Sequence, residues 1–484
     1  MSLLIENSSL KNDNKFIGEG SYGCVYYPGI DCKGKKNKKK TITKIQEINF
    51  YSENEKNIGA YIKKNIKKYK NFFSPVIKTC VVKFNTIEKS ELNLKKCDTI
   101  FEDYNYLKNY HEKMSPKKND EYNFFGENRK NLDSEIYNLK NSVDEQYYLM
   151  YVYFIKNKVF KEYYLDFSNY SNLVISLLNN FAYLLNSLRL LNVNKIVHND
   201  LHVNNILINL KTNKPIIIDF GLSFLINKCY KFNKDYIDFH YLKNFTFDYR
   251  LDNYHVNIEK RFITFVIYNK TDYFKSDIND NNADNVLTKK NIDLFIKDCY
   301  ESIISNDEIR YVFNQNELDE YKKSLEQFYY QFLNKTKYPK YNSIVKYLLD
   351  YVYAYNDLYS LTIDFIYICY SKKDLLEFAN GDKENNYKIL LRFFLQLYKK
   401  SLHPNPNMRL NLMETLEIYK FIVYYIKNVN INDNKYIGNF IIAFTKFLKS
   451  KSISIEIVFY KNFAFLDFNL ICNKSIFEFI KSGF

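Results

Sequence analysis

The 484-residue chain is 46 % hydrophobic and 26 % charged, a globular composition that excludes wholesale disorder and leaves room for two or three domains. Its formal net charge of +15 would favour anionic partners. The lysines are spread along the whole chain, however, so we interpret them as a solvated surface and find no specific nucleic-acid motif.

The eight cysteines are dispersed, and no two of them form a CxxC pair. This pattern argues against a zinc ribbon or a dense disulfide framework and predicts reduced thiols in a cytosol. The chain has neither a secretory signal at its start nor an uninterrupted apolar run of about 18 residues, so we expect no membrane span.

The first predicted element is a hairpin over residues 16–27, in which two strand-like runs flank a glycine-rich turn. The residues of interest in and beside this turn are Gly18, Glu19, Gly20, Ser21, Tyr22, Gly23 and Val25. Glycines let a backbone approach phosphates closely and offer its amides as donors, although this pattern alone also fits an ordinary hairpin. Residues 33–40 then predict a solvated loop, which leads into a strand over 41–45 that carries Lys44.

A capped helix is predicted next, with Ser52 at its start and apolar residues at helical spacing. Glu55 lies on one face of this helix and is the expected counter-ion of a buried lysine, with Glu53 as the competing choice.

Four further stretches lead to the centre of the chain. A strand is expected over residues 72–77, followed by a polar stretch over about 84–145 that is interpreted as a partly helical insertion or a mobile loop. A second strand is expected over 147–155, and the apolar stripe of 171–192 predicts a long core helix.

Residues 196–221 carry the strongest pattern, because two β-branched apolar runs flank a polar loop. The loop contains His198, Asp200 and Asn205, and the second apolar run ends in Asp219, Phe220 and Gly221. A nucleotide triphosphate with magnesium needs hard oxygen ligands held on short loops between rigid strands.

This ordered pair of motifs resembles the catalytic loop and the metal-binding loop of the protein kinase superfamily. The resemblance implies that Asp200 orients the acceptor hydroxyl and accepts its proton, and that Asn205 and Asp219 bind magnesium. It also implies that Lys44, held by Glu55, grips the α and β phosphates of ATP under the glycine-rich turn, with Val25 covering the adenine.

Two residues depart from the kinase pattern. Asn199 replaces the arginine that holds a phosphorylated activation loop in many kinases, so that form of control is not expected. His202 replaces a lysine that neutralises the transferring phosphoryl group, and we expect it to do this when protonated, with a rate that rises toward acidic pH. The sequence Asp-Leu-His also occurs in aminoglycoside and choline kinases, so a small molecule is an alternative acceptor of the phosphoryl group.

Later landmarks favour a protein acceptor. Asp357 lies in a segment that resembles a buried kinase helix whose aspartate binds the catalytic-loop backbone. Arg409 resembles the kinase arginine that pairs with the glutamate of an Ala-Pro-Glu segment in the large lobe. Glu259 is the best candidate for that glutamate. Gly59 lies one turn after Glu55, where active kinases place an apolar side chain against Phe220.

We therefore predict an α+β, bilobal, protein-kinase-like fold with a small antiparallel β lobe and a larger, mainly helical lobe. The expected divisions are a small lobe over 1–155, a large lobe over 156–428 with an insertion at about 270–345, and a C-terminal extension over 429–484 packed on the large lobe. Within the second insertion, the Asp- and Asn-rich stretch from Ser276 to Asn285 is interpreted as a solvated loop.

The chain most resembles the serine/threonine kinases of large cytoplasmic DNA viruses. This resemblance is based on the Asp-Leu-His sequence in the loop, the large insertions and the high content of Lys, Asn, Tyr and Ile. That resemblance implies an ATP- and Mg²⁺-dependent enzyme that phosphorylates Ser or Thr of protein substrates, in a host cytoplasm or a virion. A pseudokinase scaffold is the alternative from another functional class, but Lys44, Glu55, Asp200, Asn205 and Asp219 together argue against it.

Overall fold

The computed structural model describes residues 15–20, 23–36, 41–90, 92, 94–99, 146–231, 236–245, 255–268, 287–334, 336–337, 341–373, 386–429, 436–453, 456–460 and 463–467. Ser21 and Tyr22 of the glycine-rich turn lie outside these residues, as do residues 100–145 of the first insertion and the stretch from Ser276 to Asn285. The chain divides into two compact units: unit 1 has residues 1–160 and 204–223, and unit 2 has residues 161–203 and 224–484.

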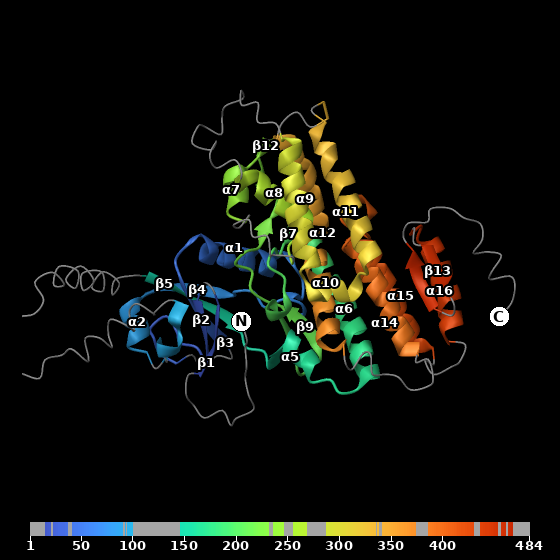
Figure 1. Ribbon diagram of the computed structural model, residues 1–484. Coiled ribbons are helices and arrows are strands. Elements are labelled where there is room, and N and C mark those ends of the chain that lie inside the picture. Colours follow the sequence, from blue (N-terminus) through green and yellow to red (C-terminus); the bar gives the residue numbers. More distant parts are fainter. Residues whose placement is uncertain are drawn as a thin grey trace, which may run out of the picture. The chain divides into compact units, whose positions relative to one another are not determined.

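Unit 1 contains a five-stranded antiparallel sheet in the order β1-β2-β3-β5-β4, drawn from blue to teal in Figure 1. Its strands are β1 (Lys15–Gly20), β2 (Gly23–Tyr27), β3 (Thr41–Glu47), β4 (Lys78–Lys83) and β5 (Gln146–Tyr153). The helices of the unit are α1 (Phe50–Asn65) and the short α2 (Phe84–Glu88). A second sheet in the order β6-β8-β9 consists of β6 (Asn157–Val159), β8 (Ile206–Asn209) and β9 (Lys214–Ile217).

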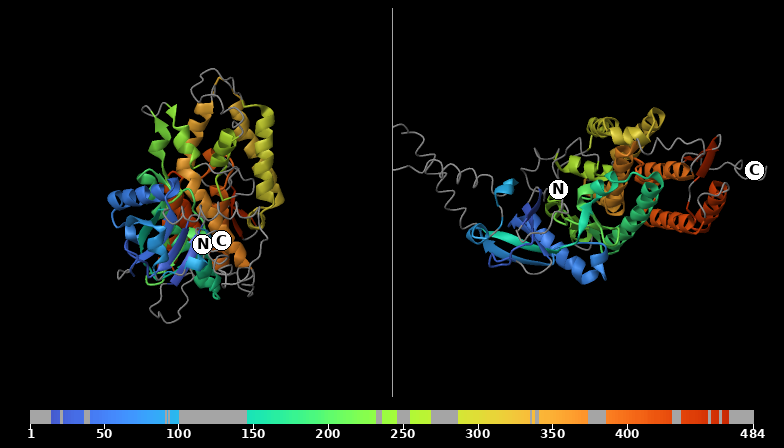
Figure 2. Two further views of the ribbon diagram at one scale, coloured as in Figure 1. Left: turned by 90° about the vertical axis from the view of Figure 1, so that its left-hand side faces the viewer. Right: turned by 90° about the horizontal axis from the view of Figure 1, so that it is seen from below.

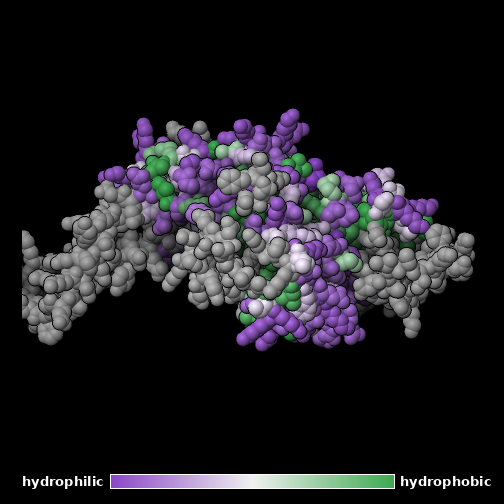
Figure 3. Space-filling model, turned by 90° about the horizontal axis from the view of Figure 1, so that it is seen from above, coloured by the Kyte–Doolittle hydropathy of each residue, from purple (hydrophilic) through white to green (hydrophobic). Residues whose placement is uncertain are grey.

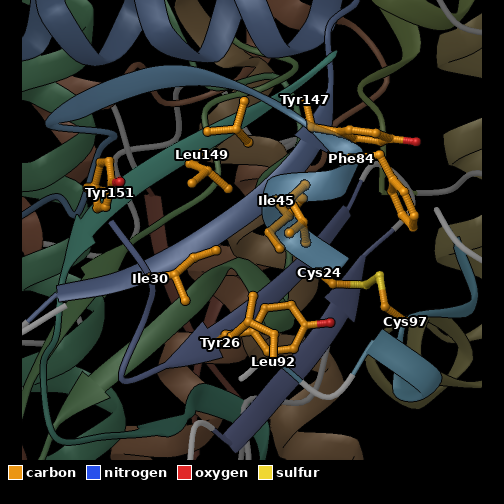
Figure 4. Close-up of a cluster of buried hydrophobic side chains, with 12 residues drawn as sticks. Cys24, Tyr26, Ile30, Ile45, Phe84, Leu92, Cys97, Tyr147, Leu149 and Tyr151 are labelled. Carbon is orange, nitrogen blue, oxygen red and sulfur yellow. A yellow bond between two sulfur atoms is a disulfide. The ribbon is translucent and has the colours of Figure 1, made fainter. Parts of the chain in front are cut away.

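One buried cluster of unit 1 lies against the five-stranded sheet, and Figure 4 shows it. It combines inward-facing residues of β2, β3 and β5 with residues from the segment that follows β4: Cys24, Tyr26, Ile45, Leu149, Phe84, Ile87, Leu92 and Cys97. The segment after β4, which the sequence marks only as a polar insertion, therefore supplies part of a core.

The prediction of reduced thiols is wrong for four of the eight cysteines. Cys24 of β2 is bonded to Cys97, and Cys32 is bonded to Cys80 of β4. The members of each pair are 73 and 48 positions apart in sequence, so the spacing gives no sign of the pairing. The sheet brings them together, because β2 and β4 belong to one layer that the chain after β4 covers.

Replacing Cys97 with serine is expected to lower the stability of unit 1 by about 2–4 kcal/mol, because a disulfide that closes a long loop restricts the unfolded chain. Hydrogen exchange of β2 at increasing urea concentration measures this loss. In a Cys32→Ser/Cys80→Ser background, a dithiol reductant should reproduce the effect of Cys97→Ser. Exchange that does not respond to the reductant would contradict the pairing of Cys24 with Cys97.

Unit 2 is mainly helical. Its helices are α5 (Phe160–Leu165, which begins at the last residue of unit 1), α6 (Tyr170–Val193), α7 (Phe239–Lys243), α8 (Ile258–Tyr268), α9 (Lys289–Ile304), α10 (Asp307–Val312), α11 (Gln315–Tyr330), α12 (Tyr341–Ser371), α14 (Asn386–Ser401), α15 (Leu412–Asn428) and α16 (Tyr436–Ser450). Short antiparallel pairs join β10 (Phe224–Leu225) to β7 (Ile196–Val197), β11 (Tyr230–Lys231) to β12 (Tyr236–Ile237), and β13 (Glu456–Tyr460) to β14 (Phe463–Asp467). A mixed α+β fold with an antiparallel sheet and a mainly helical remainder, as predicted at this coarse level, is therefore observed.

Helix α6 forms the centre of unit 2. The ring of Phe181 lies 4.6 Å from that of Phe365 and 4.5 Å from that of Tyr419. Among the described residues, α6 is the one helix long and apolar enough to cross a membrane by length and composition alone, and 56 % of its most apolar window is buried inside the structure. Its contacts with α12 and α15 are those of a core helix.

The described part of the second insertion is also packed. Phe262 of α8 lies 4.7 Å from the ring of Phe295 in α9 and 4.8 Å from that of Tyr329 in α11. The yellow helices α9 and α11 lie side by side in the views of Figures 1 and 2. The described residues of α9 and α11 therefore contribute to the core of unit 2.

Helix α16 packs on the same unit through aromatic rings. Phe444 lies 5.0 Å from the ring of Phe393 in α14 and 5.8 Å from that of Phe421 in α15.

On the face drawn in Figure 3, hydrophilic residues predominate and the hydrophobic ones are scattered, which agrees with the expected solvated surface.

Candidate functional site

The ion pair expected between Lys44 and Glu55 is present in unit 1. Lys44 Nζ of β3 lies 2.7 Å from Glu55 Oε2 of α1, and both residues are buried. Glu53 instead accepts hydrogen bonds from Lys56 Nζ, at 2.9 Å, and from the hydroxyl of Tyr148. Glu55, and not the competing Glu53, is therefore the partner of Lys44.

Helix α1 begins earlier than predicted. Asn49 is its N-cap and its side chain accepts a hydrogen bond from the backbone N–H of Ser52, at 3.0 Å. Ser52 Oγ in turn accepts one from the backbone N–H of Asn49, at 2.9 Å. This reciprocal capping box satisfies two backbone donors, and it fixes the start of the helix that carries Glu55.

Asp219 completes the charged group of unit 1. Its Oδ1 lies 3.5 Å from Lys44 Nζ and 3.4 Å from the backbone N–H of Gly221, which donates to it. Burial lowers the pKa of Lys44, but the carboxylates of Asp219 and Glu55 outweigh burial and raise its pKa above the ordinary value. Lys44 therefore stays protonated across the physiological range and presents a fixed positive charge.

A pocket opens beside these charges, and all of its lining residues belong to unit 1. Lys44, Glu55 and Asp219 contribute its charged wall. Its remaining lining is formed by Ile17, Val25, Ile42, Ser74, Val152, Tyr153, Phe154, Ile155, Asn157, Leu207 and Ile218. One wall is thus charged and the rest mostly apolar, an arrangement typical of a site for an organic ligand with an ionic end.

The glycine-rich turn lies between paired strands. Gly20 of β1 faces Gly23 of β2, and Gly18 faces Val25. A Cβ at Gly23 would collide with the carbonyl oxygen of Ile45 in the neighbouring strand, so only glycine fits there. Val25 lines the pocket, while its role in covering a ligand stays a prediction.

Asn205 and Asp219 are brought together by the β8–β9 hairpin. The backbone N–H of Ile218 donates to the carbonyl of Asn205 at 3.0 Å, so the residues that precede and follow the hairpin are neighbours. Asn205 is buried, and Asp219 has φ of +59°, in the left-handed region that aspartate tolerates better than most residues. The side chains of Asn205 and Asp219 carry amide and carboxylate oxygens, which are ligand types that a hard cation such as Mg²⁺ prefers.

Gly59 has a packing reason in this fold. A Cβ at Gly59 would lie 2.5 Å from the carbonyl oxygen of Val76, so the close approach of α1 to the chain before β4 requires glycine. Phe220 packs instead against Phe73, with the ring centroids 6.0 Å apart in an edge-on arrangement. The ring after Asp219 is therefore supported from the chain before β4.

Unit 2 holds the loop that contains Asp200. Asp357 of α12 accepts hydrogen bonds from the backbone N–H groups of His198, at 2.7 Å, and Asn199, at 3.0 Å. This is the contact expected of Asp357, and Asn199 has φ of +70°, so the carboxylate supports an unusual backbone. His202 Nε2 lies 3.8 Å from Asp200 Oδ2, and both side chains are about one-third exposed.

The expected pair of Arg409 and Glu259 is also present in unit 2. Two parallel hydrogen bonds of 2.9 Å join the guanidinium to the carboxylate, and neither side chain is exposed. The Nε of Arg409 donates to the carbonyl of His403 at 2.6 Å. The arginine thus fixes the start of α8 to the chain that precedes α15.

Lys260 of α8 is a buried charge that the sequence does not mark. Burial lowers the pKa of Lys260 to about 8, while the carboxylates of Asp200 and Asp357 oppose that shift. Below about pH 8 both the folded and the unfolded chain keep this proton, and burial of the charged Lys260 destabilises unit 2. As the pH rises from about 8 to the ordinary pKa of 10.5, the folded chain loses the proton first, so this destabilisation diminishes.

Replacing Lys260 with methionine should therefore stabilise unit 2 at pH 7, by an amount on the order of 3 kcal/mol. The gain should shrink as the pH approaches 10, because the wild-type lysine then loses its charge. Urea unfolding of wild type and variant at pH 7 and pH 10 measures this difference. An equal gain at both pH values would contradict a buried charge at this position.

The structure thus brings Lys44, Glu55 and Asp219 together at one pocket, with Val25 in its wall, and places Asn205 beside the hairpin that ends in Asp219. The other two predicted catalytic residues, Asp200 and His202, belong to the loop of unit 2. The sequence did not mark Asn54, which binds the segment after Asp219, because a polar residue beside a glutamate in a helix carries no signal of its own.

Comparison with known proteins adds no further constraint. No protein-family model matches the chain, and no curated protein is significantly similar to it.

Proposed function

We propose that the chain is a protein kinase, which transfers the γ-phosphoryl group of ATP to serine or threonine hydroxyls of proteins in the presence of Mg²⁺. The observation that carries this proposal is the convergence of Lys44, Glu55 and Asp219 on one wall of a mostly apolar pocket. A buried lysine held by one carboxylate and close to a second is suited to phosphates with a bound cation.

The residues of the pocket fit the proposed ligands. Most of its lining is apolar and its charged side chains lie together, which is the arrangement of a site for an organic cofactor with an ionic end. Apolar side chains such as Ile17, Val25 and Leu207 suit the faces of a purine ring. The oxygens of Asp219 and Asn205 are ligands that Mg²⁺ prefers.

The chain's own residues would then act by position and charge. Bound Mg·ATP supplies the transferable phosphoryl group and part of the charge that neutralises it. Lys44 binds phosphate oxygens, because Glu55 fixes its ammonium group at 2.7 Å. Asp200 orients the acceptor hydroxyl and accepts its proton, and His202, 3.8 Å away, adds positive charge when it is protonated.

A small-molecule acceptor is the second candidate, and the proximity of His202 to Asp200 favours it. The contacts of Asp357 with the loop backbone and of Arg409 with Glu259 favour a protein acceptor, since small-molecule kinases lack these landmarks. A binding scaffold is the third candidate, and it would not need the buried pair of Lys44 and Glu55 beside the partly exposed Asp219.

The proposal is tested by offering γ-labelled ATP and Mg²⁺ with three acceptors: a generic protein, an aminoglycoside and choline. We expect label on the protein with wild type and none with Asp200→Ala. Label on a small molecule alone would replace the protein acceptor with the second candidate. ATP binding without transfer to any acceptor would favour the scaffold.

A further inference from the structure

The side chain of Asn54 ties helix α1 to the segment that follows Asp219. Its Nδ2 group donates to the carbonyl oxygen of Gly221 at 2.9 Å and to that of Ser223 at 2.7 Å. Both partners are acceptors only, so the amide nitrogen must face them. The two hydrogens of one amide group thus hold two carbonyls of one turn, which is closed by the 3.2 Å bond from the backbone N–H of Ser223 to the carbonyl of Phe220.

The next residue of the helix, Glu55, binds Lys44 at 2.7 Å. Successive side chains on a helix point in different directions, so α1 contacts strand β3 through Glu55 and the turn after Asp219 through Asn54. A shift of α1 would move both contacts together. The capping box of Asn49 and Ser52, one turn earlier, fixes the end of the helix that carries them.

Asp219 needs such support. Its backbone has φ of +59°, a conformation that a non-glycine residue keeps only when its surroundings hold it. The hydrogen bonds of its carboxylate with Gly221 and its approach to Lys44 are long, at 3.4 and 3.5 Å. The two bonds that Asn54 donates to this turn are shorter, at 2.9 and 2.7 Å, and they connect the turn to α1.

We propose that Asn54 is a positioning residue, which holds the carboxylate of Asp219 where a nucleotide-bound Mg²⁺ requires it and couples it to the phosphate-binding Lys44. This inference rests on the proposed function of the pocket and assigns a new role to a residue outside its wall. Asn54 touches neither nucleotide nor metal, and its effect passes through the turn of residues 219–223.

The test measures the dissociation constant of ATP with Mg²⁺ and in EDTA, for the full chain and its variants. Asn54→Asp keeps the shape of the side chain but replaces the donor by oxygen that repels both carbonyls. Asn54→Ala removes the donor without adding charge. The control is Asn57→Asp, which makes the same chemical change at an exposed position of the same helix.

We expect Mg²⁺ to tighten ATP binding in wild type and in Asn57→Asp. In both Asn54 variants this metal-dependent gain should fall by about 10–100-fold, the usual cost of losing a group that orients a metal ligand. Affinity in EDTA should change little, because Lys44 and Glu55 remain paired. A purely structural role would lower thermal stability and leave the ratio of the two dissociation constants unchanged.

Two failures are distinguishable. If wild type binds no ATP with or without Mg²⁺, the proposed function itself is overturned. If wild type binds Mg·ATP and both Asn54 variants keep the wild-type ratio, the inference about Asn54 is overturned and the proposed function stands. If Asn54→Asp does not fold, Asn54→Ala carries the comparison, since it introduces no repulsion.

Discussion

Glu259→Gln is expected to lower the free energy of unfolding of unit 2 by about 3–5 kcal/mol, because it leaves the buried guanidinium of Arg409 without its counter-ion. Neither side chain of the pair is exposed, and two hydrogen bonds of 2.9 Å join them. Glutamine retains the shape of glutamate, so the loss reports charge rather than a cavity. Urea unfolding followed by circular dichroism, with hydrogen exchange in α8 and α15 to locate the effect, measures it.

The matched control is Glu320→Gln, which breaks an exposed ion pair in which Lys323 Nζ lies 2.7 Å from Glu320 Oε1, and it should leave stability unchanged. A double variant, Glu259→Leu with Arg409→Met, removes both charges and should recover most of the loss. If Glu259→Gln unfolds at the same urea concentration as wild type, the pair is not buried as described.

Lys44→Met is expected to lower the rate of phosphoryl transfer by about 10²–10³-fold, the usual effect of removing one preorganised charge from the reacting group. Methionine retains most of the length of the lysine side chain but cannot hold Glu55 or phosphate. The same variant should also weaken the binding of Mg·ATP. Initial rates of label transfer and a calorimetric titration of Mg·ATP measure the two effects.

Lys78→Met on β4 is the control for this substitution, since Lys78 is an exposed lysine of the same sheet and lies outside the pocket. It should leave both the transfer rate and the affinity for Mg·ATP at wild-type values. Unchanged binding and transfer in Lys44→Met would contradict the assignment of the pocket to a nucleotide.

The pairs that the sequence predicted correctly are those in which a motif marks both partners. Lys44 with Glu55, and Arg409 with Glu259, were each expected from a family pattern, and each forms a buried ion pair. Charged residues of opposite sign that are both buried have few alternative partners, so position in a known order was enough to match them.

The features that the sequence missed depend on contacts without a local pattern. The disulfide of Cys24 and Cys97 joins residues of ordinary spacing, and only the layering of the sheet brings them together. Asn54 differs from other helix asparagines only by the two carbonyls that it reaches. Gly59 looked like a missing apolar contact, but the distance to the carbonyl of Val76 shows that a side chain would not fit.

The insertion at about 270–345 stays a prediction, since it was inferred from length beyond a family pattern. Its described residues Phe295 and Tyr329 pack against Phe262 in the core of unit 2. The amphipathic periods of α9 and α11 are visible in the sequence. What they pack against could not be inferred, because it depends on tertiary neighbours far along the chain.

The proposed phosphoryl transfer is tested by comparing the labelled γ-phosphate that wild type and Asp219→Asn transfer to protein at saturating Mg²⁺. We expect acid-stable label on serine or threonine with wild type. Asp219→Asn should transfer at least about a hundredfold less label, which is the effect expected for removing one preorganised charge, because Asp219 is both a proposed Mg²⁺ ligand and a neighbour of Lys44. Equal label from the two proteins, or none from wild type under conditions where it binds Mg·ATP, would contradict the proposal.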